Sequence, residues 1–161
     1  MTKFLLTAAV ITGLLAALAN LARRKWLFNI LALAIQYVCI FIVFPKTDGF
    51  MHALIKIIVG LMSTLIIYLT IQSTGAVKRE PFEFKLSAGE LFRMLSAVFL
   101  VTLVVLASPW LLKEVFPQSN IYILILSLGL ALIGLLQLGS KTESLYVIIG
   151  LLTFLSGFEL L

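Results

Sequence analysis

Six long runs of apolar residues divide this chain, and they constrain its fold more than any other feature. A helix needs about 20 apolar residues to cross the roughly 30 Å of hydrocarbon in a bilayer. A transmembrane β-strand would alternate apolar and polar residues over about ten positions, whereas these runs are continuous and rich in Leu and Ile. We therefore predict an all-α, polytopic integral membrane protein with a single domain of about six transmembrane helices. The expected spans are Phe4–Ala22, Trp26–Phe44, Phe50–Gln72, Leu91–Leu112, Ile121–Leu138 and Ser144–Leu161.

The composition separates this chain from soluble proteins. Of its 161 residues, 62% are hydrophobic and 12% are charged, whereas soluble domains are about 45–50% apolar and about 25% charged. A single core in a chain of this length cannot bury so much apolar surface. The composition therefore excludes a water-soluble enzyme, a disulfide scaffold and a disordered tail.

The basic residues between the expected spans predict an orientation. Cytoplasmic loops of membrane proteins are enriched in Lys and Arg. One side of the membrane would hold three of these residues, namely Lys3, Lys46 and Lys113. The other side would hold eight, namely Arg23, Arg24, Lys25, Lys78, Arg79, Lys85, Arg93 and Lys141. The asymmetry predicts that both termini lie outside the cytoplasm, and it gives the cytoplasmic side a surface for anionic lipid.

The sequence lacks the residue groupings that enzyme chemistry uses. It has no HExxH motif, no P-loop and no dinucleotide fingerprint. Its one cysteine, Cys39, lies within an apolar run and cannot form an internal disulfide, and no Cys/His cluster could hold a metal. We expect no catalytic residue, no metal site and no cofactor, and at most the role of a non-catalytic subunit in an enzyme complex. The basic charges are not clustered on a soluble element, so no nucleic-acid partner is expected.

Polar residues inside a membrane are costly and often functional, and the third span holds the densest set. His52, Lys56, Gly60, Thr64 and Tyr68 recur every four residues, which places them along one helix face that should point at protein or water. Lys56 could take part in a proton or ion path. Alternatively its long stem could snorkel to the interface or pair with an acid, because it lies roughly 9 Å from the start of the span. His52 is nearer the edge, where it is expected to be interfacial, and it is a supporting candidate for the ion path.

Two further residues complete the candidate ion path. Glu159 is the acid within the last apolar run, and it could carry protons or pair with a lysine of another helix. If instead the chain stops at Leu161, Glu159 is near enough to the end to be solvated. Gln36, on the second span, is expected to hydrogen-bond between helices and to support Lys56 and Glu159.

The first two spans and the last two spans resemble each other at an offset of 118 residues. In that alignment Ala16 falls on Gly134, and Leu33 falls on Leu151. Each unit is a pair of apolar helices joined by a short basic turn. The repeat predicts two similar hairpins in the same orientation.

The second of these hairpins resembles a known family. Within Leu128–Leu161, Gly-Leu-Ala-Leu-Ile-Gly-Leu-Leu, a polar turn and Leu-Tyr-Val-Ile-Ile-Gly-Leu follow one another. This stretch resembles the first two helices of the complex I K subunit, the C subunit of Mrp antiporters and the E component of membrane-bound hydrogenases. The resemblance implies a place in a proton-conducting membrane arm. Lys141 matches the basic turn of that group, Leu152 stands where it has a glutamate, and Glu159 follows seven residues later on the same helix face.

We therefore expect a membrane subunit of a multisubunit complex, one that translocates protons or ions and is related to respiratory-chain or hydrogenase complexes. Its partners would be other integral membrane subunits and membrane lipids. A bacterial-type plasma membrane is the expected location, with an organellar or thylakoid membrane as the alternative. Two other functions stay open: a purely structural or assembly subunit that binds lipid, pigment or protein, and a small stand-alone transporter. The transporter would need a cavity near the middle of the membrane.

Overall fold

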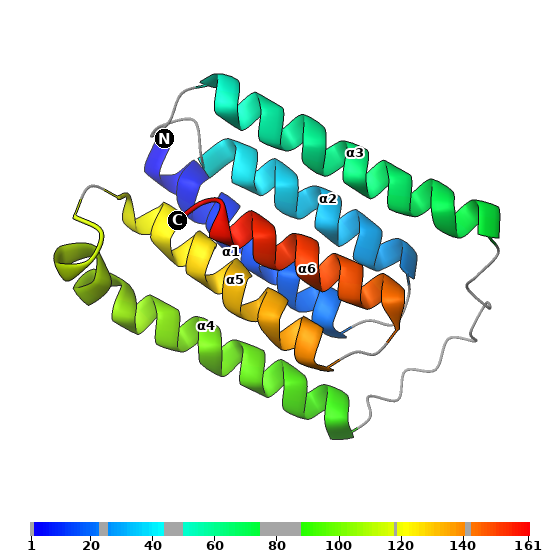
Figure 1. Ribbon diagram of the computed structural model, residues 1–161. Helices are drawn as coiled ribbons and strands as arrows, with labels where there is room; N and C mark the ends of the chain where they lie inside the picture. Colours follow the sequence, from blue (N-terminus) through cyan, green and yellow to red (C-terminus); the bar gives the residue numbers. More distant parts are fainter. Residues whose placement is uncertain (1, 23–25, 44–49, 75–87, 118, 141–142) are drawn as a thin grey trace.

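The chain folds into a bundle of α-helices (Figure 1). The computed structural model describes residues 2–22, 26–43, 50–74, 88–117, 119–140 and 143–161. Within these ranges it contains helices and no strand, so the all-α prediction is confirmed. The helices are α1 (Thr2–Ala22), α2 (Trp26–Val43), α3 (Phe50–Thr74), α4 (Ala88–Glu114), α5 (Ile121–Ser140) and α6 (Ser144–Phe158).

Five of these helices, α1 to α5, are long and apolar enough to cross a membrane. The sixth, α6, has 15 residues and ends at Phe158, three residues before the end of the expected span. α4 begins three residues before its expected span, at Ala88. α5 begins after Asn120, whose side-chain Oδ1 accepts a hydrogen bond from the backbone N–H of Tyr122 at 3.2 Å, a typical helix N-cap.

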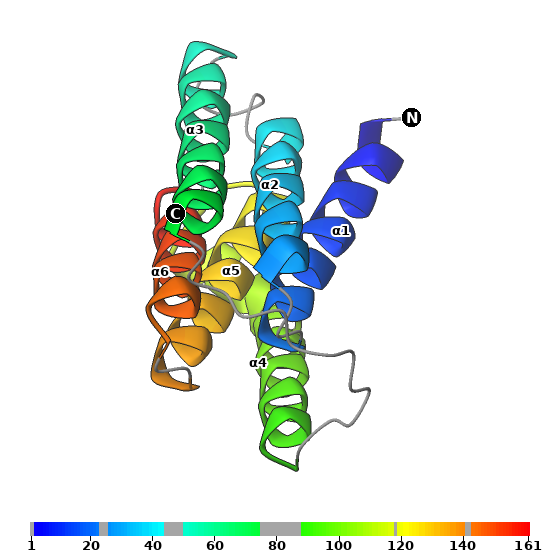
Figure 2. The ribbon, with the colours of Figure 1, turned by 90° about the vertical axis from the view of Figure 1, so that its right-hand side faces the viewer.

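Successive helices run antiparallel, so that α1 begins and α6 ends at the same end of the bundle (Figure 1). We call this end the α1-start end. α5 packs against α1, α4 and α6, and α2 packs against α1, α3 and, over a shorter length, α6. α3 and α4 lie at opposite edges in both views (Figures 1 and 2). These two helices therefore expose broad apolar faces, whereas α1, α2 and α5 are about half buried.

Glycines allow α5 and α6 to approach backbone to backbone. A Cβ atom at Gly134 of α5 would lie 2.5 Å from the backbone N of Phe154, and one at Gly157 of α6 would lie 2.5 Å from the backbone N of Ala131. Small residues at helix interfaces permit such contacts in membranes, where van der Waals packing replaces much of the hydrophobic driving force. The α5–α6 hairpin is therefore the most tightly packed part of the bundle.

The two hairpins that the repeat predicts are present, but they bury different faces. Leu33 of α2 is fully buried, whereas Leu151 of α6, its counterpart in the alignment, is 46% exposed. Ile30 is buried and Ile148, its counterpart, is exposed. The aligned pair Ala16 and Gly134 is buried in both hairpins. The repeat thus extends to the pairing of helices and only in part to the residues that face the core.

Candidate functional site

Lys56 and Glu159, which are 103 residues apart in sequence, meet at the α1-start end. The Nζ atom of Lys56 donates a hydrogen bond to the backbone carbonyl oxygen of Glu159 at 2.8 Å. The same Nζ lies 3.9 Å from Oε2 of the Glu159 carboxylate. The shorter contact is therefore the one to the backbone. The Glu159 side chain is 59% exposed, whereas that of Lys56 is 24% exposed.

Lys56 bonds to a backbone carbonyl at the end of α6. The last carbonyl groups of a helix have no partners within it, and in a membrane such groups must be satisfied by protein or by water. The N–H groups of Glu159, Leu160 and Leu161 bond to the carbonyls of Leu155, Gly157 and Phe158, respectively. Lys56 satisfies the next carbonyl, that of Glu159. Its positive charge also interacts favourably with the negative end of the helix dipole.

Two positions indicate how deep this end of α6 lies. Gly157 packs against Ser127 and Ala131, which are six and ten residues beyond the start of α5 at Ile121. At 1.5 Å per residue, the end of α6 is therefore about 9–15 Å below the start of α5. Lys56 is six residues into α3, or about 9 Å from its start by the same rise. Because Nζ of Lys56 lies 2.8 Å from the Glu159 carbonyl oxygen, the Lys56 side chain reaches the level of the end of α6.

Gln36 of α2 reaches α6 one turn below Glu159. Its Nε2 donates a hydrogen bond to Ser156 Oγ at 3.0 Å, and the Ser156 hydroxyl donates to the carbonyl of Thr153 at 2.8 Å. The Gln36 side chain is fully buried, and its Oε1 accepts no hydrogen bond from the described part of the chain. Gln36 therefore links two helices, as expected, while one of its polar atoms is unsatisfied.

Replacement of Gln36 with leucine is expected to change the stability of the bundle by less than about 1 kcal/mol. The substitution removes one interhelical bond, and it also removes a buried oxygen that has no partner. Ser156 keeps its bond to the carbonyl of Thr153. Thermal unfolding in mild detergent measures the change. Gln36→Glu is the matched control, because it keeps the shape and adds a buried charge, and it should destabilise the bundle strongly.

The part of the polar stripe from Gly60 to Tyr68 contacts α2, whereas Lys56 contacts α6 and His52 is exposed. Gly60 is buried against the ring of Tyr37, and Thr64 is buried with its hydroxyl bonded to the carbonyl of Gly60. The ring of Tyr68 lies 6.0 Å from that of Trp26. This part of the stripe therefore helps to attach α3 to α2.

His52 lies one turn before Lys56 and is exposed. Gln137 is fully buried on α5, near the opposite end of the bundle, and its Nε2 donates to the carbonyl of Tyr146 on α6 at 3.4 Å. This contact confirms that Gln137 bonds between helices, but it is remote from Lys56. Sequence reasoning missed Ser156 as a partner of Gln36, although Ser156 and Thr153 lie on one face of α6.

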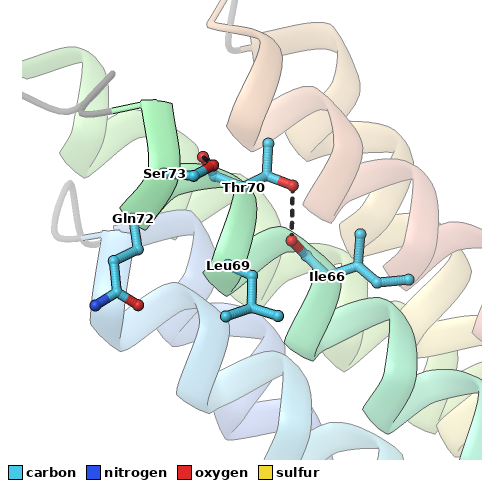
Figure 3. A pocket seen from close by; sticks show the side chains of 5 residues that line it. All are labelled: Ile66, Leu69, Thr70, Gln72 and Ser73. Carbon is cyan, nitrogen blue, oxygen red and sulfur yellow. Dashed lines mark hydrogen bonds between the residues drawn. The ribbon is translucent and has the colours of Figure 1, made fainter.

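The described part of the chain also has two surface hollows, neither of which is lined by Lys56 or Glu159. The first, of about 500 Å³, is lined by five residues of α3 alone: Ile66, Leu69, Thr70, Gln72 and Ser73 (Figure 3). Thr70 and Ser73 donate their hydroxyls to backbone carbonyls of α3, and the exposed Gln72 adds an amide to the lining. The second, of about 480 Å³, is an apolar groove between α1 and α2. Neither hollow is the mid-membrane cavity that a transporter needs.

No group of three His, Cys, Asp or Glu side chains that could hold a metal occurs in the described residues. The candidate site is therefore the Lys56–Glu159 pair, with Gln36 and Ser156 one turn below it. Comparison with protein-family models, with curated proteins and with solved structures finds no match to this chain.

Proposed function

We propose that this chain is a non-catalytic membrane subunit of a larger complex that translocates protons or cations, and that the Lys56–Glu159 pair is its contribution to the ion path. The observation that carries the proposal is the meeting of these two charges at the same depth on helices that are far apart in sequence. Intramembrane charges are rare and tend to mark ion or proton pathways.

The geometry supports different tasks for the two residues. Lys56 is 24% exposed and held by the carbonyl of Glu159, so it supplies a fixed positive charge. The Glu159 side chain is 59% exposed, and its carboxylate is therefore free to exchange a proton or to bind a cation. A carboxylate beside a fixed lysine could bind a proton or a cation transiently during translocation.

Partner subunits have two broad faces available. α3 is packed mainly against α2, and α4 mainly against α5 and α1, so both present exposed apolar residues along their outer sides. We infer that other integral membrane subunits cover part of these faces and that lipid covers the rest. From the basic residues between the helices we also infer a bacterial-type plasma membrane with both termini outside the cytoplasm.

The test is ion-coupled activity of the intact complex carrying Glu159→Gln. We expect a loss on the order of a hundredfold, the scale of a positioned proton-transfer group. Glu143→Gln is the matched control, because Glu143 is an exposed acid just before α6 at the opposite end of the bundle. Unchanged activity with Glu159→Gln in a fully assembled complex would reject the ion-path role.

A second function is favoured by one specific contact, the bond from Lys56 to the backbone of Glu159. If this bond only completes the end of α6, the chain is a structural subunit. Lys56→Met would then reduce assembly of the complex, whereas Glu159→Gln would leave both assembly and activity intact, because the backbone carbonyl remains. The two variants together separate the two functions.

A further inference from the structure

We propose that lipid, and not a partner subunit, covers the outer face of α4 in the assembled complex. This face lies at one edge of the bundle (Figures 1 and 2), and its exposed residues recur every three or four positions. They are Phe92, Leu95, Phe99, Leu103, Leu106 and Trp110. The inference rests on the proposed function for the existence of partner subunits, and it assigns lipid to one of the two broad faces that α3 and α4 present.

Two basic residues stand at the ends of this face, one bilayer thickness apart. Arg93 and Lys113 are separated by 20 residues, or about 30 Å of helix, which matches the thickness of the hydrocarbon core. Nε of Arg93 donates a hydrogen bond to the carbonyl oxygen of Gly89 at 3.1 Å, so this side chain is directed one turn back toward the start of α4. Lys113 is exposed in the last turn. Each charge is therefore placed to reach the lipid headgroups on its own side of the membrane.

Aromatic side chains lie just inside both basic residues. Phe92 is 71% exposed beside Arg93, and Trp110 is 63% exposed one turn before Lys113. Tryptophan is enriched at membrane–water interfaces, where its ring is in apolar surroundings and its N–H reaches a polar partner. On α3, the exposed large hydrophobic side chains among those described are all aliphatic: Met51, Ile55, Ile58, Val59, Leu61, Met62, Leu65, Ile66 and Leu69. The aromatic ends therefore distinguish the outer face of α4 from that of α3.

Large side chains also occupy the middle of the face. Phe99 is 65% exposed and Leu106 is 74% exposed. Helices that pack against each other in a membrane commonly place small residues at the contact, as α5 and α6 do at Gly134 and Gly157. None of the six residues of the outer face is small. Such a surface suits flexible acyl chains better than a closely packed helix.

The backbone of α4 needs no partner at the point where a proline interrupts the helix. Pro109 has no N–H to donate to the carbonyl of Val105. The hydroxyl of Ser108 donates to that carbonyl at 2.8 Å. The exposed Thr102 likewise donates its hydroxyl to the carbonyl of Val98 at 2.9 Å. These groups are satisfied within α4 itself, as contact with lipid requires.

The first test is photo-crosslinking of the full chain in its native membrane. A benzophenone amino acid, which inserts into nearby C–H bonds on illumination, replaces Phe99 or Leu106 on α4. Met62 of α3 is the matched position on the other edge of the bundle, since it is 56% exposed and lies 12 residues into its helix, against 11 for Phe99. All three side chains are exposed, so their replacement leaves the core unchanged. The mass of the illuminated chain distinguishes a lipid adduct from a protein adduct.

We expect Phe99 and Leu106 to give lipid adducts and no adduct with another protein, whereas Met62 should give a protein adduct. A protein adduct at Phe99 or Leu106, with a partner subunit or with a second copy of this chain, would overturn the assignment. Lipid adducts at all three positions would support the assignment of α4 and count against the partner subunits of the proposed function. Crosslinking requires no transport activity, so the two results are separable.

The second test measures the depth of the aromatic end in vesicles of brominated lipid. Trp26→Phe leaves Trp110 as the one tryptophan of the full-length chain. Bromines near the headgroup should quench Trp110 more strongly than bromines near the end of the acyl chain. The reverse order is expected when Phe99→Trp is introduced into a chain that carries Trp26→Phe and Trp110→Phe. Strongest quenching of Trp110 by the deep bromines would contradict the match between this face and the bilayer.

Discussion

Gly134→Ala is expected to destabilise the whole bundle by about 1–3 kcal/mol, the range for overpacking of a well-packed core. The new methyl group would lie 2.5 Å from the backbone N of Phe154, 2.7 Å from its Cα and 2.9 Å from the carbonyl oxygen of Gly150. These are backbone atoms, so no side chain can rotate to relieve the contact and α6 must move away from α5. Gly157→Ala should act in the same direction, since its Cβ would meet the backbone of Ala131 and Ser127.

Gly139→Ala is the matched control. Gly139 lies on the same helix as Gly134, and a Cβ there would meet nothing within 4 Å. Alanine is favoured over glycine in a helix interior by about 0.8–1.0 kcal/mol, so this variant should be as stable as the parent or slightly more stable. Thermal unfolding in mild detergent, followed by circular dichroism, compares the variants. Equal stability of Gly134→Ala and Gly139→Ala would contradict the close approach of the α5 and α6 backbones at Gly134.

Lys56→Met is expected to reduce stability by about 1.5–3 kcal/mol, the range for a hydrogen bond that involves a charged group. Methionine keeps much of the apolar stem and removes the ammonium, so the carbonyl of Glu159 loses its donor at a depth where few others exist. Hydrogen exchange localises the effect. Relative to the parent protein, exchange in Lys56→Met should accelerate more at the amides of Glu159 and Leu160 than at amides in the middle of α6.

Two further variants separate the contributions to this loss. Lys56→Arg keeps the positive charge and the donors, and it should restore most of the stability. Glu159→Gln keeps the backbone carbonyl and removes only the ion pair at 3.9 Å, whose partner is largely exposed, so it should change stability by less than about 1 kcal/mol. A larger loss for Glu159→Gln than for Lys56→Met would mean that the carboxylate, and not the carbonyl, is the main partner of Lys56.

The helices were predictable because each lies within a long apolar run, and such a run satisfies its own backbone in a membrane only as a helix. The end of α6 was harder to predict. The run Ser144–Leu161 is mostly apolar, but the helix ends at Phe158; beyond it Leu160 is buried in the core and Glu159 is exposed.

The residues of the candidate site could be predicted from the sequence, but the contacts between them could be predicted only in part. Lys56 and Glu159 stand out as charges within apolar runs, and their pairing was one of the alternatives that the sequence left open. The bond from Lys56 to a backbone carbonyl could not be foreseen, since it depends on the depth at which α6 ends. Likewise, Gln36 was expected to bond between helices, but its partner, Ser156, depends on the register between α2 and α6.

The separation of Lys56 from Glu159 also has a consequence for biogenesis. At 5–20 residues per second, the ribosome needs about 5–20 s to add the 103 residues between them. During that time the partner of Lys56 on α6 has not yet been synthesised. Early synthesis intermediates should therefore leave α3 loosely inserted near the translocon, and completion of α6 should draw it into place. Truncation before α6 would expose such an intermediate to membrane quality-control proteases.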